Sequence, residues 1–509
     1  MESGRPLKNY CISIVRINIE QGSTLAQTDD KNIKMGKRER LLIRSKNAAA
    51  YTAFLWELVL VAVIVLMQPS MDCTQMATLS IVQELFNIGF LNAFATVPLI
   101  SIPTVFSLFS LIFHAGQLIK MGYGIPGEVP LPFQLYGESV HLQKAFLFYL
   151  LSQMLLTVGI YLVEKKGRQK NESTKKLLPE NVLWCGEVLM VIGALPRIFI
   201  DFRALAASRS GGYEGVYLLY TPQALQTLAF FFDAGLLFLL FGCNDKRKRS
   251  LLFLAVLLYK GLMMSTGSRQ EKIGFLLVWL YLYYFVLQKI NYKKLAGLVV
   301  LCVVGLMFVM AIGSVRSSSG AGVAGIVHAM FSSRATYMLG NILGEFGAAI
   351  DTIIIAVKYA PDTINYGLGT TYIAGLLSVI PGLISKFPVL AESTSFLGKI
   401  PQDVVYALGG SYLGEFYYNF AWLGSVLCVP LGALLAAMQD CITSEKTGTS
   451  EKCWYAALTT LLLLFVRGYF TDMIQKLVWL FLALIFLRLW ETERINATYR
   501  MRERSRRAE

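Results

Sequence analysis

The sequence consists largely of long apolar blocks separated by short polar segments. The blocks run for about 16 to 21 residues, the length a helix needs to cross the hydrocarbon core with its backbone hydrogen-bonded internally. They predict an all-α, polytopic helical membrane protein with about twelve transmembrane helices. We place the spans at residues 49–67, 76–95, 98–119, 145–163, 182–200, 223–242, 251–266, 273–288, 295–313, 412–438, 454–470 and 474–490.

The distribution of Lys and Arg along the chain predicts the orientation. With a cytoplasmic N-terminus, the basic clusters at 165–176, 246–249, 289–294 and 494–507 all fall on the cytoplasmic side, as the positive-inside rule requires. We therefore expect a basic cytoplasmic tail at 1–48, a membrane domain at 49–490 and a basic cytoplasmic tail at 491–509. Both termini then lie in the cytoplasm.

The composition agrees with a membrane protein and argues against several other classes. The chain is 55% hydrophobic and only 16% charged, whereas soluble domains carry about a quarter charged residues. The net charge of +14 comes from the loop clusters, so we expect contact with the bilayer and no nucleic-acid partner. With three histidines in the whole chain, we expect no metal site and no cofactor.

One long segment, residues 314–411, lies outside the membrane in this topology. It is too apolar to be disordered and too polar to be a simple span. Residues 339–357, which include Glu345 and Asp351, have the pattern of an interfacial helix, and residues 370–384 either lie flat or re-enter the membrane. Such a segment can cover a cavity at the outer surface and contribute substrate contacts.

Arginines recur on the outer side, where the positive-inside bias disfavours them. A guanidinium group offers paired donors that match phosphate oxygens, so these arginines are candidates for an anion site. The alternative is that each is a solvated or snorkelling surface residue. The set consists of Arg203, Arg209, Arg269, Arg316 and Arg334, with Arg467 in the last outer turn.

A carboxylate stands at the outer end of the tenth predicted span, where Glu415 follows Tyr412 in a glycine-rich segment. Glu415 either accepts a proton from an attacking hydroxyl or orients an arginine. Asp472 can pair with Arg467 in the last turn. We assign catalytic roles to Arg269, Arg316, Glu415 and Arg467, and substrate contacts to Arg203, Arg209, Arg334, Glu345, Asp351, Tyr412 and Asp472.

Several short motifs resemble those of Wzy-type oligosaccharide repeat-unit polymerases. They are Gly-Ser-Arg at 267–269, residues 366–372 followed by Ile380 and Pro381, the segment 410–424 beginning Gly-Ser-Tyr-Leu-Gly-Glu-Phe-Tyr-Tyr-Asn-Phe, and Arg467 with Gly468. The resemblance covers about residues 259–470. Ala421 departs from the glycine common in the family, at a packing position.

The resemblance implies a metal-independent membrane glycosyltransferase in the cytoplasmic (inner) membrane. It would transfer a growing glycan from its undecaprenyl diphosphate carrier onto the next lipid-linked repeat, at the outer face. The product would be O-antigen, capsule or exopolysaccharide, and a chain-length regulator and a flippase are the implied partners.

Two alternatives stay open at this point. An O-antigen ligase shares the topology and substrate class, and a flippase or secondary transporter shares the many spans. A transporter needs ionisable groups stacked along a pathway, whereas Glu187, Arg197, Asp233 and Lys260 are expected to be scattered.

Overall fold

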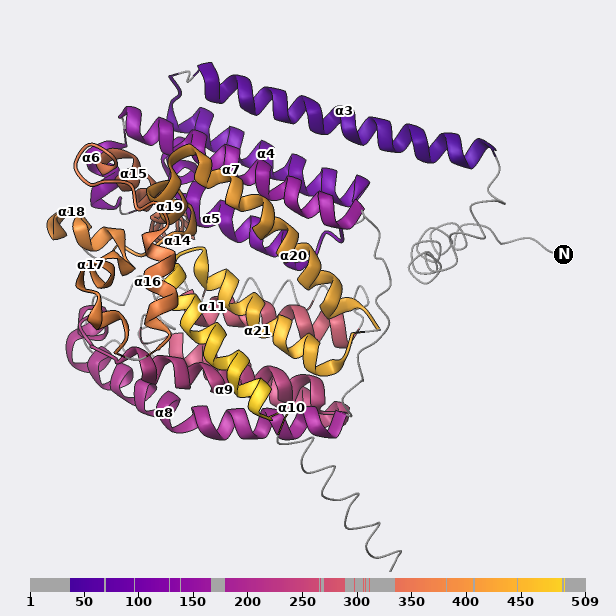
Figure 1. Cartoon of the computed structure of the whole chain (residues 1–509), viewed down its shortest axis with the longest axis vertical. Helices are drawn as coiled ribbons and strands as arrows, with labels where there is room; N and C mark the ends of the chain where they lie inside the picture. Colours follow the sequence, from indigo (N-terminus) through magenta and orange to yellow (C-terminus); the bar gives the residue numbers. More distant parts are fainter. Residues whose placement is uncertain are drawn as a thin grey trace, which may run out of the picture.

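The computed structural model describes residues 37–67, 70–95, 97–127, 129–137, 139–165, 179–264, 266, 270–288, 297, 305, 307, 311, 335–380, 382–405, 408–445, 447–487 and 489. Every regular element in these residues is a helix, and the longer helices lie side by side in a bundle (Figure 1). The all-α class predicted from the apolar blocks is confirmed.

Seven helices in the described part of the chain are long and apolar enough to cross a membrane, and the shorter apolar helix Tyr51–Met67 adds to them. The seven are Ile102–Gly122, Val140–Val163, Val182–Ser210, Gln223–Gly242, Leu339–Tyr359, Tyr412–Thr443 and Phe470–Leu487. A multi-pass membrane protein is therefore supported. The number twelve stays a prediction, and the span expected at 295–313 lies largely outside the described residues.

The first helices form one half of the bundle, with α3 along its edge (Figure 1). Leu55, Trp56 and Leu60 of α3 are exposed, as expected of a helix that faces lipid. In the interior, the Gln153 side chain of α7 donates to Ser110 Oγ of α5 at 2.9 Å. The helices are α3 (Lys37–Met67), α4 (Cys73–Phe94), α5 (Ile102–Gly122), α6 (Leu131–Tyr136) and α7 (Val140–Lys165).

Helices α8 and α9 lie at the opposite edge and pack closely because glycines occupy their interface (Figure 1). A methyl group added at Gly193 would lie 2.1 Å from the backbone nitrogen of Phe232, and one at Gly235 would lie 2.6 Å from that of Met190. The elements here are α8 (Pro179–Tyr217), α9 (Gln223–Gly242), α10 (Lys246–Met264), α11 (Gln270–Tyr281) and the π-helical turn η1 (Leu282–Leu287).

The segment Leu339–Tyr359 is packed inside the bundle, which differs from the interfacial helix we expected. It forms α14 (Ala335–Gly347) and α15 (Ala349–Tyr359), which pack against α5, α7 and α19 (Tyr412–Phe420). A methyl group at Gly347 would lie 2.1 Å from the Gln117 nitrogen of α5. Gly347 thus serves close helix packing.

Both ends of this segment lie near the connection between α5 and α7. A methyl group at Gly340 would meet the Pro126 oxygen, just after α5, and the Tyr359 hydroxyl lies 3.3 Å from that of Tyr136, just before α7. The middle of the segment is buried and its ends return to one side of the bundle.

Short helices follow and gather at the end of the bundle opposite the α20–α21 connection (Figure 1). They are α16 (Thr370–Ser378), η2 (Ile384–Lys386), α17 (Pro388–Ala391), η3 (Glu392–Thr394), η4 (Phe396–Lys399) and α18 (Gln402–Val405). The side chain of Gln475, on the last helix Phe470–Leu487, donates to the Ser378 oxygen at 3.0 Å, so α16 is fixed against that helix.

The remaining helices carry the chain back through the bundle and bring the resemblance motifs near its centre. After α19 come η5 (Ala421–Leu427), α20 (Cys428–Thr443) and α21 (Thr449–Phe465). Ser411 is the N-cap residue of helix α19, and its side-chain oxygen accepts a hydrogen bond from the Gly414 N–H at 3.4 Å.

We predict that Gly193→Ala destabilises the protein by about 1 to 3 kcal/mol, because the new methyl group forces the α8 and α9 backbones apart. Gly261→Ala is the matched control. That position in α10 is open, so helix propensity there favours alanine by up to about 1 kcal/mol. Thermal unfolding of both variants in detergent would measure the difference. Equal melting temperatures would contradict the packing argument.

Candidate functional site

Two glycine-containing turns pack directly on each other in the described part of the chain. A methyl group at Gly410 would lie 2.7 Å from the Gly468 carbonyl carbon, and one at Gly409 would lie 3.0 Å from Arg467 Nε. The Thr352 hydroxyl of α15 donates to the Gly409 oxygen at 2.9 Å. The turn that precedes α19 therefore positions the turn that carries Arg467.

Glu415 connects the same two regions. Its side chain is fully buried, and its Oε2 accepts from the backbone N–H of Phe470 at 2.9 Å. Phe470 is the first residue of the last helix, where a negative charge is favoured by the helix dipole. Glu415 thereby holds the start of that helix just after Arg467.

A third motif, residues 366–372, packs on the other end of α19. The N–H groups of Gly367 and Leu368 donate to the Tyr418 and Asn419 oxygens at 2.9 and 3.1 Å. The Asn419 amide also donates to Thr371 Oγ1 at 2.8 Å. The described parts of three separate sequence motifs thus meet around α19.

Tyr372, at the end of the 366–372 motif, interacts electrostatically with Glu415. Burial raises the pKa of the Tyr372 hydroxyl above its usual range, and the Glu415 carboxylate raises it further. Tyr372 is therefore a neutral hydroxyl at neutral pH.

A cavity of about 430 Å³ opens beside the Arg467 turn. Its wall carries both signs of charge, with cations from Arg467 and Lys476 and carboxylates from Glu271 and Asp472. The other lining residues are Gln226, Leu461, Leu464, Phe465, Gly468, Tyr469 and Met473. The cavity thus offers donors for an anion and acceptors for hydroxyl groups.

The structure places the predicted site residues in different environments. Arg467 and Asp472 line the cavity, whereas Arg269, Arg316 and Arg334 lie outside the described residues. Their convergence with Arg467 stays a prediction.

The other predicted contacts lie away from the cavity lining. Arg203 donates to the Tyr220 oxygen at 3.3 Å, Arg209 is exposed and Glu345 is half-buried. The Tyr412 hydroxyl lies 3.0 Å from Ser110 Oγ in the core. Asp351 is fully buried, and its oxygens have no hydrogen-bond partner among the described residues. Arg467 interacts with its carboxylate electrostatically.

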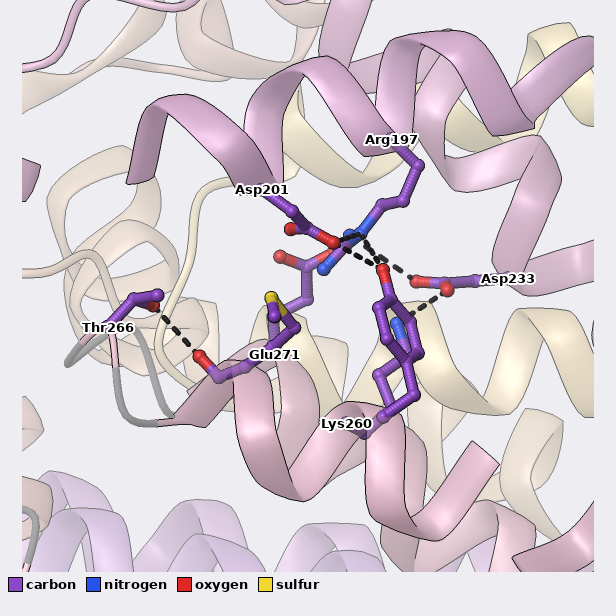
Figure 2. A network of polar contacts seen from close by, with 8 residues as sticks. Arg197, Asp201, Asp233, Lys260, Thr266 and Glu271 are labelled. Atoms are coloured by element: carbon purple, nitrogen blue, oxygen red, sulfur yellow. Dashed lines mark hydrogen bonds and ion pairs between the residues drawn. The ribbon is translucent and has the colours of Figure 1, made fainter. Parts of the chain in front are cut away.

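The expectation that Glu187, Arg197, Asp233 and Lys260 are scattered is wrong for the last three, whereas Glu187 is exposed on α8. Arg197 Nη1 lies 3.7 Å from Asp233 Oδ2, and Lys260 Nζ lies 2.5 Å from Asp233 Oδ1 (Figure 2). The three positions are far apart in sequence, but the packing of α8, α9 and α10 brings them together. The expected scatter therefore gives no argument against a transporter.

This ion-pair cluster reaches the cavity through a residue that sequence reasoning did not select. Arg197 Nη1 also lies 3.1 Å from Glu271 Oε1, and Glu271 lines the cavity (Figure 2). Glu271 follows the Gly-Ser-Arg motif by two residues, and the second missed residue, Lys476, follows Asp472 by one helical turn. In the sequence, the only feature that could have identified Glu271 or Lys476 as a cavity residue was its proximity to a motif or to a selected residue.

The comparison with known proteins gives one family. The family described as O-antigen polysaccharide polymerase Wzy matches residues 51–498, which include every motif described above. No curated protein and no solved structure matches the chain. The extent of the family match shows that the chain belongs to the O-antigen polysaccharide polymerase Wzy family.

Proposed function

We propose that the protein joins undecaprenyl-diphosphate-linked oligosaccharide repeat units into a surface polysaccharide at the outer face of the cytoplasmic membrane. The family supports repeat-unit polymerisation. The observation that carries the proposal is the cavity beside the two packed turns, where Arg467 and Lys476 supply positive charge. A chain-length regulator and a flippase are the expected partners.

The proposed reaction transfers the growing glycan to a hydroxyl group of the next repeat. The hydroxyl oxygen bonds to the anomeric carbon with inversion, the bond from that carbon to the diphosphate oxygen breaks, and the hydroxyl proton passes to water at the outer face. Negative charge grows on the departing diphosphate, so a guanidinium group that binds it lowers the barrier. Arg467 fills this role, with Arg269 and Arg316 as further candidates.

For Glu415, the contact with Phe470 supports a positioning role over that of a base. The carboxylate is fully buried and bonded to the turn that follows Arg467. It also does not line the cavity. We therefore assign Glu415 to holding Arg467 in place. The proposed reaction needs no metal, because the arginines neutralise the leaving group.

Substitution of Arg467 tests the function. Arg467→Ala should lower polymerisation by about 100-fold or more, and Arg467→Lys by about tenfold, because lysine keeps the charge but loses the paired donors. Polymer length on gels and the pool of carrier-linked single repeats would measure both. Arg247→Ala, an exposed residue of α10, is the control and should leave polymer length unchanged. Normal polymer from Arg467→Ala would overturn the proposal, and loss of attachment without loss of long carrier-linked chains would indicate a ligase.

Glu415→Gln separates the two roles of that residue. Glutamine keeps an oxygen that accepts from the Phe470 N–H, so polymerisation should persist within about threefold, whereas Glu415→Leu should abolish it by freeing the turn. The same gel assay, with thermal stability as a parallel measurement, applies. A loss in Glu415→Gln as complete as in Glu415→Leu would show that Glu415 is the base.

The proposed orientation places residues 314–411 on the outer side, with Leu339–Tyr359 packed into the bundle from that side, and both termini in the cytoplasm. The native Cys73 is first replaced by serine so that it does not react. A cysteine placed at the exposed Thr363 should then react with an impermeant maleimide added to intact cells. A cysteine at Asn171 should react only after lysis. The reverse pattern would invert the topology.

A further inference from the structure

Glu271 differs from the other carboxylates of the ion-pair cluster in facing the cavity. Its side chain is 34% exposed, against 11% for Asp201 and 3% for Asp233. All three lie within 4 Å of Arg197, but only Glu271 lines the cavity. One side of Glu271 is thus held by protein and the other is available to a ligand.

The cluster fixes the position of that carboxylate. Arg197 is 4% exposed, and besides Glu271 it contacts Asp201 at 3.2 Å and Asp233 at 3.7 Å (Figure 2). Lys260 holds Asp233 from the other side. The four helices α8, α9, α10 and α11 each contribute a charged group, and Arg197, itself fixed by Asp201 and Asp233, holds Glu271 on one side.

Asp472 supplies a second carboxylate to the same cavity. Its Oδ1 accepts from the Gln223 amide at 3.2 Å, so this oxygen is also held by the protein. Glu271 is paired with Arg197, and Lys476 lines the same cavity, so the two carboxylates are not an uncompensated negative surface. Held in place, they accept hydrogen bonds from sugar hydroxyl groups, so the part of the substrate beside them must be rich in donors.

We propose that Glu271 and Asp472 form a subsite for the acceptor sugar, separate from the diphosphate contact at Arg467. This proposal rests on the proposed polymerase function. It selects a terminal sugar with free hydroxyl groups, whose donors match the two carboxylates. Glu271 binds the hydroxyl groups, and Arg197 is a positioning residue that acts through it.

Asp201 provides a matched control for Glu271, because both carboxylates contact Arg197 and only one lines the cavity. The probe is the carrier-linked single repeat unit extracted from cells that lack the polymerase. With purified protein in nanodiscs, Glu271→Leu should lower the rate of joining at low substrate concentration by at least about tenfold, the effect of losing one charge-assisted hydrogen bond. Asp201→Asn keeps an oxygen that accepts from Arg197, so Glu271 stays in position and the rate should stay within about threefold of the parent, while both variants lose thermal stability.

The outcomes separate this inference from the proposed function. If Glu271→Leu and Asp201→Asn lower the rate equally, or if neither does while Arg467→Ala abolishes joining, the subsite is wrong and the polymerase proposal stands. If Arg467→Ala also joins repeats normally, the proposed function itself fails. Retention of activity by Glu271→Gln above that of Glu271→Leu would support hydroxyl binding, since glutamine keeps one acceptor oxygen. Equal rates for these two variants would overturn it.

Discussion

The contact between the turns at Gly410 and Gly468 is the constraint on which the cavity depends. Their backbones approach so closely that even a methyl group would clash, so the two turns are held in one relative position. This contact sets the positions of the cavity-lining residues in the turn at Gly468 and in the last helix. Arg467 lies over Gly409, Glu415 binds the first N–H of the helix, and Asp472 and Lys476 then face the cavity one helical turn apart.

A second constraint comes from the charges between the helices. An ionised group away from water costs several kcal/mol unless its partners are close and well oriented. Arg197 meets that condition with carboxylates from three helices, and Lys260 completes the cluster. Apolar residues could join these helices without this cost, whereas the ion pairs also bring a carboxylate to the cavity. That carboxylate is Glu271.

The sequence predicted the helical class, the membrane and the family, because apolar length and short motifs are local properties. It also placed Arg467 and Asp472 at one site, since they share a turn. It failed where the answer depends on packing between distant segments. Residues 339–357 had the pattern of an interfacial helix although they pack inside the bundle against α5. Arg197 and Lys260 were expected apart although α8, α9 and α10 bring them to one aspartate. No periodicity along one segment contains that information.

The two signs of charge in the cavity suit a substrate that itself has two unlike parts. The reaction proposed above brings a diphosphate and a sugar hydroxyl to neighbouring points, and a site of uniform charge would favour only one of them. In the proposed reaction the carboxylates, which are fixed by an ion pair and by Gln223, would need no rearrangement when the acceptor arrives. Arg467 lies in a turn that Glu415 secures, so in that reaction its charge would be in place as the diphosphate departs. The catalytic benefit then comes from charge that grows in the transition state, and it does not require tight binding of the carrier, which must leave after each cycle.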